Sequence, residues 1–248
     1  MSPDLTQPVG LTSKRRFLRR LAEGVSQPPW SARAAVVAVV VSFGGIYGLP
    51  AVLSLLLPGG WHDADFLWPT LVEHLPLLVC LVWLARRAGL TVGTVFGLRG
   101  VRVGKVLVSG LLLFILDMLL MGAVGAGFEW LGFAPGTGEQ EQARATAASF
   151  FEFTDTVVWT PLCEELACRA LLYTALRTRL GIASSSIITA AVFVSMHGLD
   201  SIADAGAFFF AALLSSLWYE RTRSLWPNII DHALFNLVVT LAGAATKT

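Results

Sequence analysis

The stretch Val157–Tyr173 reads VVWTPLCEELACRALLY and places two adjacent glutamates, Glu164 and Glu165, inside an apolar run. If lipid surrounds this run, one carboxylate at bilayer depth costs several kcal/mol, and a second beside it adds repulsion between like charges. A chain keeps such a pair only where the carboxylates are paired, protonated, exposed to water or used in chemistry. The stretch therefore indicates a polar site, provided that the chain lies in a membrane.

The composition of the whole chain is that of a membrane protein. Hydrophobic residues make up 55 % of the 248 residues and charged residues only 14 %, whereas soluble domains contain about a quarter charged residues. The three cysteines all lie in apolar segments, and their odd number indicates no secreted disulfide framework. We interpret them as small buried hydrophobic residues.

Apolar stretches recur along the chain and predict an all-α fold, a polytopic transmembrane helical bundle. Most of them approach the roughly 20 residues needed to cross about 30 Å of hydrocarbon, although the fifth and sixth are short. The seven expected spans are residues 34–57, 66–85, 104–127, 150–176, 183–199, 205–219 and 224–243. We therefore expect residues 31–248 to form one integral membrane domain.

The distribution of basic residues predicts the orientation of this domain. Residues 1–30 are rich in Lys and Arg and are expected to form a basic cytoplasmic or interfacial arm. With the N-terminus in the cytoplasm, fifteen of the eighteen Lys and Arg residues lie inside, Arg144 and Lys247 lie outside, and Arg169 lies within the membrane. This excess satisfies the positive-inside rule. We expect a multi-pass protein of the plasma membrane with a cytoplasmic N-terminus.

Three expected spans in the second half of the chain carry polar residues of the types that act in catalysis. These spans are residues 150–176, 183–199 and 224–243. Residues four apart share one face of a helix, so Glu165 and Arg169 are expected to form an ion pair. Glu164 points about 100° away from Glu165 and is available to face another group. The spacing therefore predicts that Glu165 supports the site as the ion-pair partner of Arg169 and that Glu164 takes part in the chemistry.

His197 follows Phe193 by four residues, and Asn236 follows His232 by four. His232 and Asn236 can both donate hydrogen bonds to one developing negative charge, as an oxyanion hole requires. Phe193 is expected to form the apolar wall of the His197 pocket. Because a carboxylate with a histidine can take a proton from water and return it to a leaving amine, these residues predict hydrolysis of an amide without a covalent intermediate.

Structural roles could explain each of these features singly. A Glu–Arg pair can join two helices, and a lone histidine is often a core residue. Three such features on three helices, in a chain with four histidines, favour a site. Glu73 and His74 are interpreted as interfacial and left outside the site, whereas Asp117 could pair with Arg169 or face a cavity.

The ordered motifs Glu-Glu-x-x-x-Arg, Phe-x-x-x-His and His-x-x-x-Asn resemble the CPBP family of intramembrane glutamic endopeptidases. This is the CAAX-protease and bacteriocin-processing, or Abi, family, which includes the Ras-converting CAAX endopeptidases. The resemblance covers about residues 150–243, which we take as the protease-like core. It implies water activation by Glu164 and His197, oxyanion binding by His232 and Asn236, and support by Glu165 and Arg169.

The chain departs from the family pattern in two places. Family members commonly have Gly after the motif arginine, where this chain has Ala170. Eukaryotic CAAX enzymes have eight spans, which an interfacial segment such as Leu90–Lys105 would complete here. Ala170 is small enough to keep close helix packing, and the number of spans is either completed by that interfacial segment or differs from the number in those enzymes.

The resemblance implies an endopeptidase that cuts a membrane-associated or lipidated peptide or protein and contacts membrane lipid. No cofactor and no nucleic acid is expected, although Glu164, His197 and His232 could instead form a zinc site. A non-catalytic Abi-type immunity or peptide-binding membrane protein is the alternative function. A transporter is disfavoured, because the first three spans hold no counterpart of the Glu-Glu-x-x-x-Arg motif.

Overall fold

A computed structural model describes residues 32–48, 68–87, 102–136, 150–197 and 201–245, together with positions 52, 55, 56, 91 and 93. Within these residues every regular element is a helix, which confirms the predicted all-α class. The expected arm at residues 1–30, most of the segment Leu90–Lys105 and the side chain of Glu73 lie outside the described part of the chain.

The described helices begin and end close to the expected spans. They are α2 (Ala32–Phe43) with the π-helical η1 (Gly44–Gly48), α4 (Trp68–Arg87), α6 (Val103–Trp130), α8 to α10 (150–177), α11 (Ile182–Ser195), α12 (Ile202–Thr222) and α13 (Trp226–Ala245). The fifth span was expected over residues 183–199, but α11 ends at Ser195 and is only 14 residues long. At 1.5 Å per residue it covers about 21 Å, less than the hydrocarbon thickness.

The helix that carries Glu164 is continuous but contains two π-helical segments. Its segments are α8 (Phe150–Thr154), η3 (Asp155–Trp159), α9 (Thr160–Glu165), η4 (Leu166–Tyr173) and α10 (Thr174–Arg177), of which η3 and η4 are π-helical. Pro161 has no N–H to donate and its ring crowds the preceding turn, so the wide turn of η3 directly before α9 accommodates it. Each wide turn also rotates the side chains that follow.

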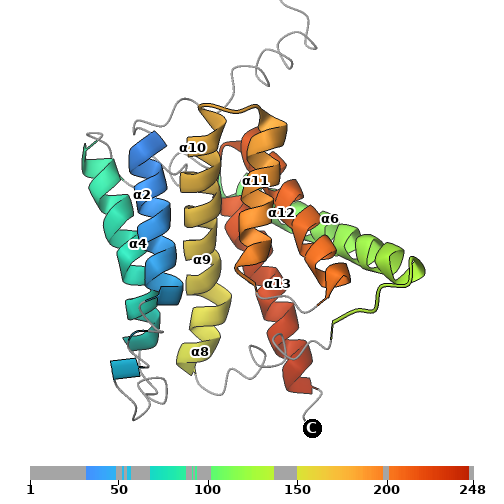
Figure 1. Ribbon diagram of the computed structural model, residues 1–248. Helices are drawn as coiled ribbons and strands as arrows, with labels where there is room; N and C mark the ends of the chain where they lie inside the picture. The colour runs from blue at the N-terminus through green and yellow to red at the C-terminus, as the bar shows by residue number, and fades with distance from the viewer. Residues whose placement is uncertain are drawn as a thin grey trace, which may run out of the picture.

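This continuous helix forms the centre of the molecule (Figure 1). α2 and α4 pack on one side of it, and α11 and α13 contact it on the other. Leucines of α4 and residues of η4 share a buried core that includes Leu77, Leu81, Leu171 and Tyr173. The helix that carries Glu164 is thus packed between α2 and α4 on one side and α11 and α13 on the other.

α6 packs along α12 and α13 and projects away from the central helix in Figure 1. Its close contact with α13 depends on a glycine, because a Cβ at Gly110 would lie 2.7 Å from Cγ2 of Ile230. Another face of α6 is apolar and exposed, with Leu107, Leu111 and Ile115 spaced one turn apart. Such a stripe suits contact with lipid.

Two helices of the described residues, α6 and α12, are long and apolar enough to cross a membrane, judged by length and composition. α11 is apolar but shorter. The count of seven spans therefore stays a prediction.

Candidate active site

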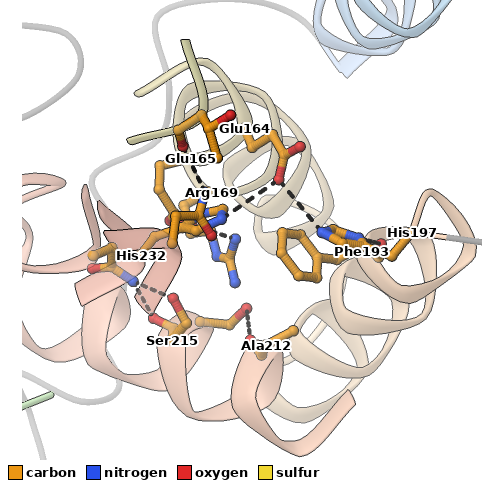
Figure 2. A network of polar contacts seen from close by, with 12 residues as sticks. Glu164, Glu165, Arg169, Phe193, His197, Ala212, Ser215 and His232 are labelled. Carbon is orange, nitrogen blue, oxygen red and sulfur yellow. Dashed lines mark hydrogen bonds and ion pairs between the residues drawn. The ribbon is translucent and has the colours of Figure 1, made fainter. Parts of the chain in front are cut away.

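One cavity of about 350 Å³ brings together all seven site residues predicted from the sequence. Its wall is built by the central helix with α4, α6, α11, α12 and α13. The seven residues are Glu164, Glu165, Arg169, Phe193, His197, His232 and Asn236. Figure 2 shows six of these side chains converging from three separate parts of the chain.

Glu165 and Arg169 form the predicted ion pair. Nη1 of Arg169 donates to Oε1 of Glu165 at 2.8 Å, and the residues are 1 % and 2 % exposed, respectively. The guanidinium carbon of Arg169 also lies 4.9 Å from the centroid of the Phe193 ring. The pair is therefore fully desolvated and fixed against an aromatic wall, where both charges depend on each other.

Glu164 faces two imidazoles (Figure 2). Its Oε2 lies 3.8 Å from Nε2 of His197 and 3.9 Å from Nε2 of His232. Both distances are longer than a direct hydrogen bond. The carboxylate oxygen and the two nitrogens thus surround a point at which a small polar group could contact all three.

His197 lies in the turn that follows α11 rather than inside the helix. Its backbone N–H donates to the carbonyl of Val194, and its Nδ1 lies 2.7 Å from the carbonyl oxygen of Phe193. Because a carbonyl only accepts, Nδ1 carries the proton, and a neutral His197 ring presents an unprotonated Nε2 to Glu164. The Phe193 ring packs against the imidazole with 4.3 Å between centroids.

His232 lies between the two glutamates. Besides its Nε2 contact with Glu164, its Nδ1 lies 3.3 Å from Oε1 of Glu165. The sequence analysis predicted only Arg169 as a partner of Glu165, so the contact between His232 and Glu165 was not predicted. Asn236 uses one hydrogen of its carboxamide nitrogen on the carbonyl of Thr156 at 2.8 Å, which leaves the second hydrogen of that nitrogen for another acceptor.

The interpretation of His74 as an interfacial residue is wrong. His74 is 4 % exposed and lines the cavity, and its Nε2 lies 3.3 Å from Oδ1 of Asp155. His74 reaches the cavity because α4 packs against η3, and this packing cannot be read from the local sequence. Asp155 was missed for the same reason.

Two aspartates complete the polar wall. Asp117 faces the cavity, one of the two positions considered for it, and Asp231, which the sequence did not single out, does so too. Oδ1 of each has no hydrogen-bond partner among the described residues. An aspartate directly before a motif histidine was the signal that could have drawn attention to Asp231.

The alternative zinc site does not fit this arrangement. In the described part of the chain no three His, Cys, Asp or Glu side chains are placed to hold a metal ion. Oε2 of Glu164 lies 3.8 and 3.9 Å from the two imidazole nitrogens, whereas neighbouring ligands of a tetrahedral zinc with bonds of about 2.0–2.1 Å lie about 3.3 Å apart.

Residues 146–238 match a family model described as Rce1-like, type II CAAX prenyl endopeptidase. The matched segment contains all seven predicted site residues and nearly coincides with the protease-like core expected at 150–243. No curated protein and no solved structure gave a significant match.

Proposed function

Because residues 146–238 belong to the membrane-embedded CAAX endopeptidase family, as the three motifs predicted, we propose that the protein is an intramembrane glutamic endopeptidase. Family membership implies a protease. Our proposal adds that the substrate is a membrane-associated or lipidated peptide or protein and that Glu164 activates the attacking water. The observation that supports it best is the position of the Glu164 carboxylate between two imidazole nitrogens on the wall of the cavity.

The first step is the attack of water on the scissile carbonyl. A water molecule beside Oε2 of Glu164 is within reach of Nε2 of His197. In the neutral ring this nitrogen carries no proton, because Nδ1 holds the proton and donates it to the Phe193 carbonyl. Glu164 takes one proton as the O–C bond forms, and His197 orients the water. General-base assistance of this kind contributes about 10²- to 10⁴-fold in rate.

The tetrahedral intermediate needs donors for its oxyanion. Asn236 offers its second amide hydrogen, and His232 offers Nε2–H. Since Nδ1 of His232 donates to Glu165, Nε2 donates only when the ring carries both protons.

The second step breaks the C–N bond. The proton held by Glu164 passes to the leaving amine, so that water has supplied one hydrogen to the amine and a hydroxyl to the new carboxyl group. Arg169 holds the Glu165 carboxylate oriented toward His232 throughout. No covalent enzyme intermediate and no metal step is required.

Comparative proteomics tests the function and finds the substrate. Membranes carrying wild-type protein are compared with membranes carrying Glu164→Ala, with Glu129→Gln, an acid on the exposed end of α6, as control. We expect an uncut substrate to accumulate with Glu164→Ala although the variant is present at normal levels. A phenotype that persists in Glu164→Gln but is lost on altering the cavity wall would instead identify a peptide-binding or immunity protein.

A further inference from the structure

Asp117 on α6 and Asp231 on α13 take no part in the proposed reaction. They are 8 % and 4 % exposed, and both line the cavity that contains Glu164. Oδ1 of each aspartate lacks a hydrogen-bond partner among the described residues. A buried carboxylate oxygen is costly without a donor, so two of them on one cavity wall indicate that a donor enters from outside the chain.

Asp117 and Asp231 lie on two helices that pack against each other, and both line the same cavity. α6 approaches α13 closely at Gly110, where the contact is to Ile230, the residue before Asp231. Asp231 is near enough to Asp117 for the two charges to interact. Two carboxylates placed together repel each other unless a cation or a shared proton lies between them.

The other groups of the cavity do not supply that cation. Arg169 lies within electrostatic range of both aspartates, but its hydrogen bond goes to Glu165. The described lining holds five carboxylates against one guanidinium and three imidazoles. Even with every imidazole protonated, these groups leave the cavity with one net negative charge. A cavity of this sign concentrates cations.

We propose that Asp117 and Asp231 form a subsite that binds a basic side chain of the substrate peptide, the guanidinium of Arg or the ammonium of Lys. This inference rests on the proposed peptidase function and names its substrate class. A guanidinium can donate two parallel hydrogen bonds to a carboxylate through its planar fork. A metal ion suits the pair less well, because no third ligand joins it among the described residues.

Peptides that differ only in charge test the subsite. Purified wild-type protein first cuts a randomised peptide library in detergent, and mass spectrometry shows which positions around the cut favour Arg or Lys. Matched peptides then carry Arg or its uncharged analogue citrulline at that position. We expect kcat/KM to favour Arg by about tenfold or more, the scale of a buried charge pair, and the ratio to approach one in Asp117→Asn and Asp231→Asn.

The ratio of the two peptides on the same variant cancels any general loss of activity. Glu129→Gln, which removes an exposed acid of α6 instead, should keep the wild-type ratio. If Asp231→Asn does not fold, the ratio measured with Asp117→Asn on the other helix decides whether the subsite exists. Equal cleavage of both peptides by wild type at every position, or an unchanged ratio in both Asn variants, would overturn the subsite.

Equilibrium binding separates this proposal from the peptidase function. Glu164→Ala protein, which is not expected to cut, should bind the Arg peptide at least about tenfold more tightly than the citrulline peptide. If wild type cuts no peptide but this difference in binding is found, the subsite stands and the peptidase function fails. If wild type cuts peptides and no difference is found, the subsite fails alone.

Discussion

Glu165 has two partners, and together they explain how a second carboxylate beside Glu164 is tolerated. Arg169 donates to its Oε1 at 2.8 Å, and Nδ1 of His232 lies 3.3 Å from the same oxygen. Glu164 faces the two imidazoles instead. The separation of the two roles followed from helical spacing alone. The His232 contact did not, because it depends on how α13 packs against the central helix.

The Glu165–Arg169 pair should control stability as well as geometry. Arg169→Gln leaves a buried carboxylate without its strongest partner, and we expect the free energy of unfolding to fall by about 3–5 kcal/mol. Thermal unfolding in detergent measures this, with the exposed Arg179→Gln as the matched control. If the two variants unfold at the same temperature, the pair does not stabilise the fold.

The proposed mechanism uses no metal ion. We expect purified protein to retain its peptidase activity after treatment with a strong chelator and to contain no stoichiometric zinc by elemental analysis. Glu164→Gln should be inactive before and after the treatment. Activity that is lost with the chelator and restored by added zinc would replace the glutamate mechanism with zinc chemistry.

At the scale of the helices, two wide turns shape the site. η3 precedes Pro161, and its Thr156 carbonyl accepts the hydrogen bond of Asn236. η4 follows Glu165 and carries Arg169. The apolar run predicted a helix here, but α- and π-helical turns share the same composition, so the sequence could not show where the winding changes. Proline was the only local signal.

The His74–Asp155 contact joins α4 to η3, one residue before Thr156. His74→Ala and Asp155→Asn should therefore displace Asn236 and lower kcat by about 10- to 100-fold, the usual effect of losing a group that orients a reacting residue. KM should change less, because substrate binding is not the step affected. Asp204→Asn, which removes a carboxylate outside the cavity lining, is the control. A changed KM with unaltered kcat would place His74 in substrate binding instead.

At the scale of the whole molecule, two helix ends that are predicted to be cytoplasmic, those of α10 and α12, contact each other. Glu220 near the end of α12 contacts Arg177 at the end of α10 at 3.4 Å and Arg223 at 3.2 Å. Both helix ends were assigned to the cytoplasm from their basic residues. The contact therefore joins two helix ends that the sequence analysis assigned to the same side of the membrane.

Cysteine labelling tests this orientation. In a variant without Cys80, the half-buried cysteine, Arg179→Cys should react with an impermeant maleimide only from the cytoplasmic side. Leu131→Cys, 62 % exposed in the wild type, should react only from the outside. Labelling of both positions from the same side would show that the predicted topology is wrong.

The sequence predicted the second half of the molecule better than the first. The three motifs of the second half lie within the segment that matches the family. The residues of each motif lie on a single helix or in the turn directly after it. Of the residues that were missed or left unassigned, His74 and Asp117 lie on α4 and α6, before that segment, whereas Asp155 and Asp231 lie within it. Their approach to Glu164 depends on packing between distant helices, which no local pattern records. The early end of α11 at Ser195 escaped prediction because its apolar run continues past the turn.

The most direct test of the central claim is the rate of peptide cleavage by purified Glu164→Gln. This substitution keeps the size of the side chain but removes the base, so we expect kcat to fall by at least about 10²-fold. Glu129→Gln should keep the wild-type rate, and the melting temperature of Glu164→Gln should show that it is folded. Cleavage by folded Glu164→Gln at the wild-type rate would contradict water activation by Glu164.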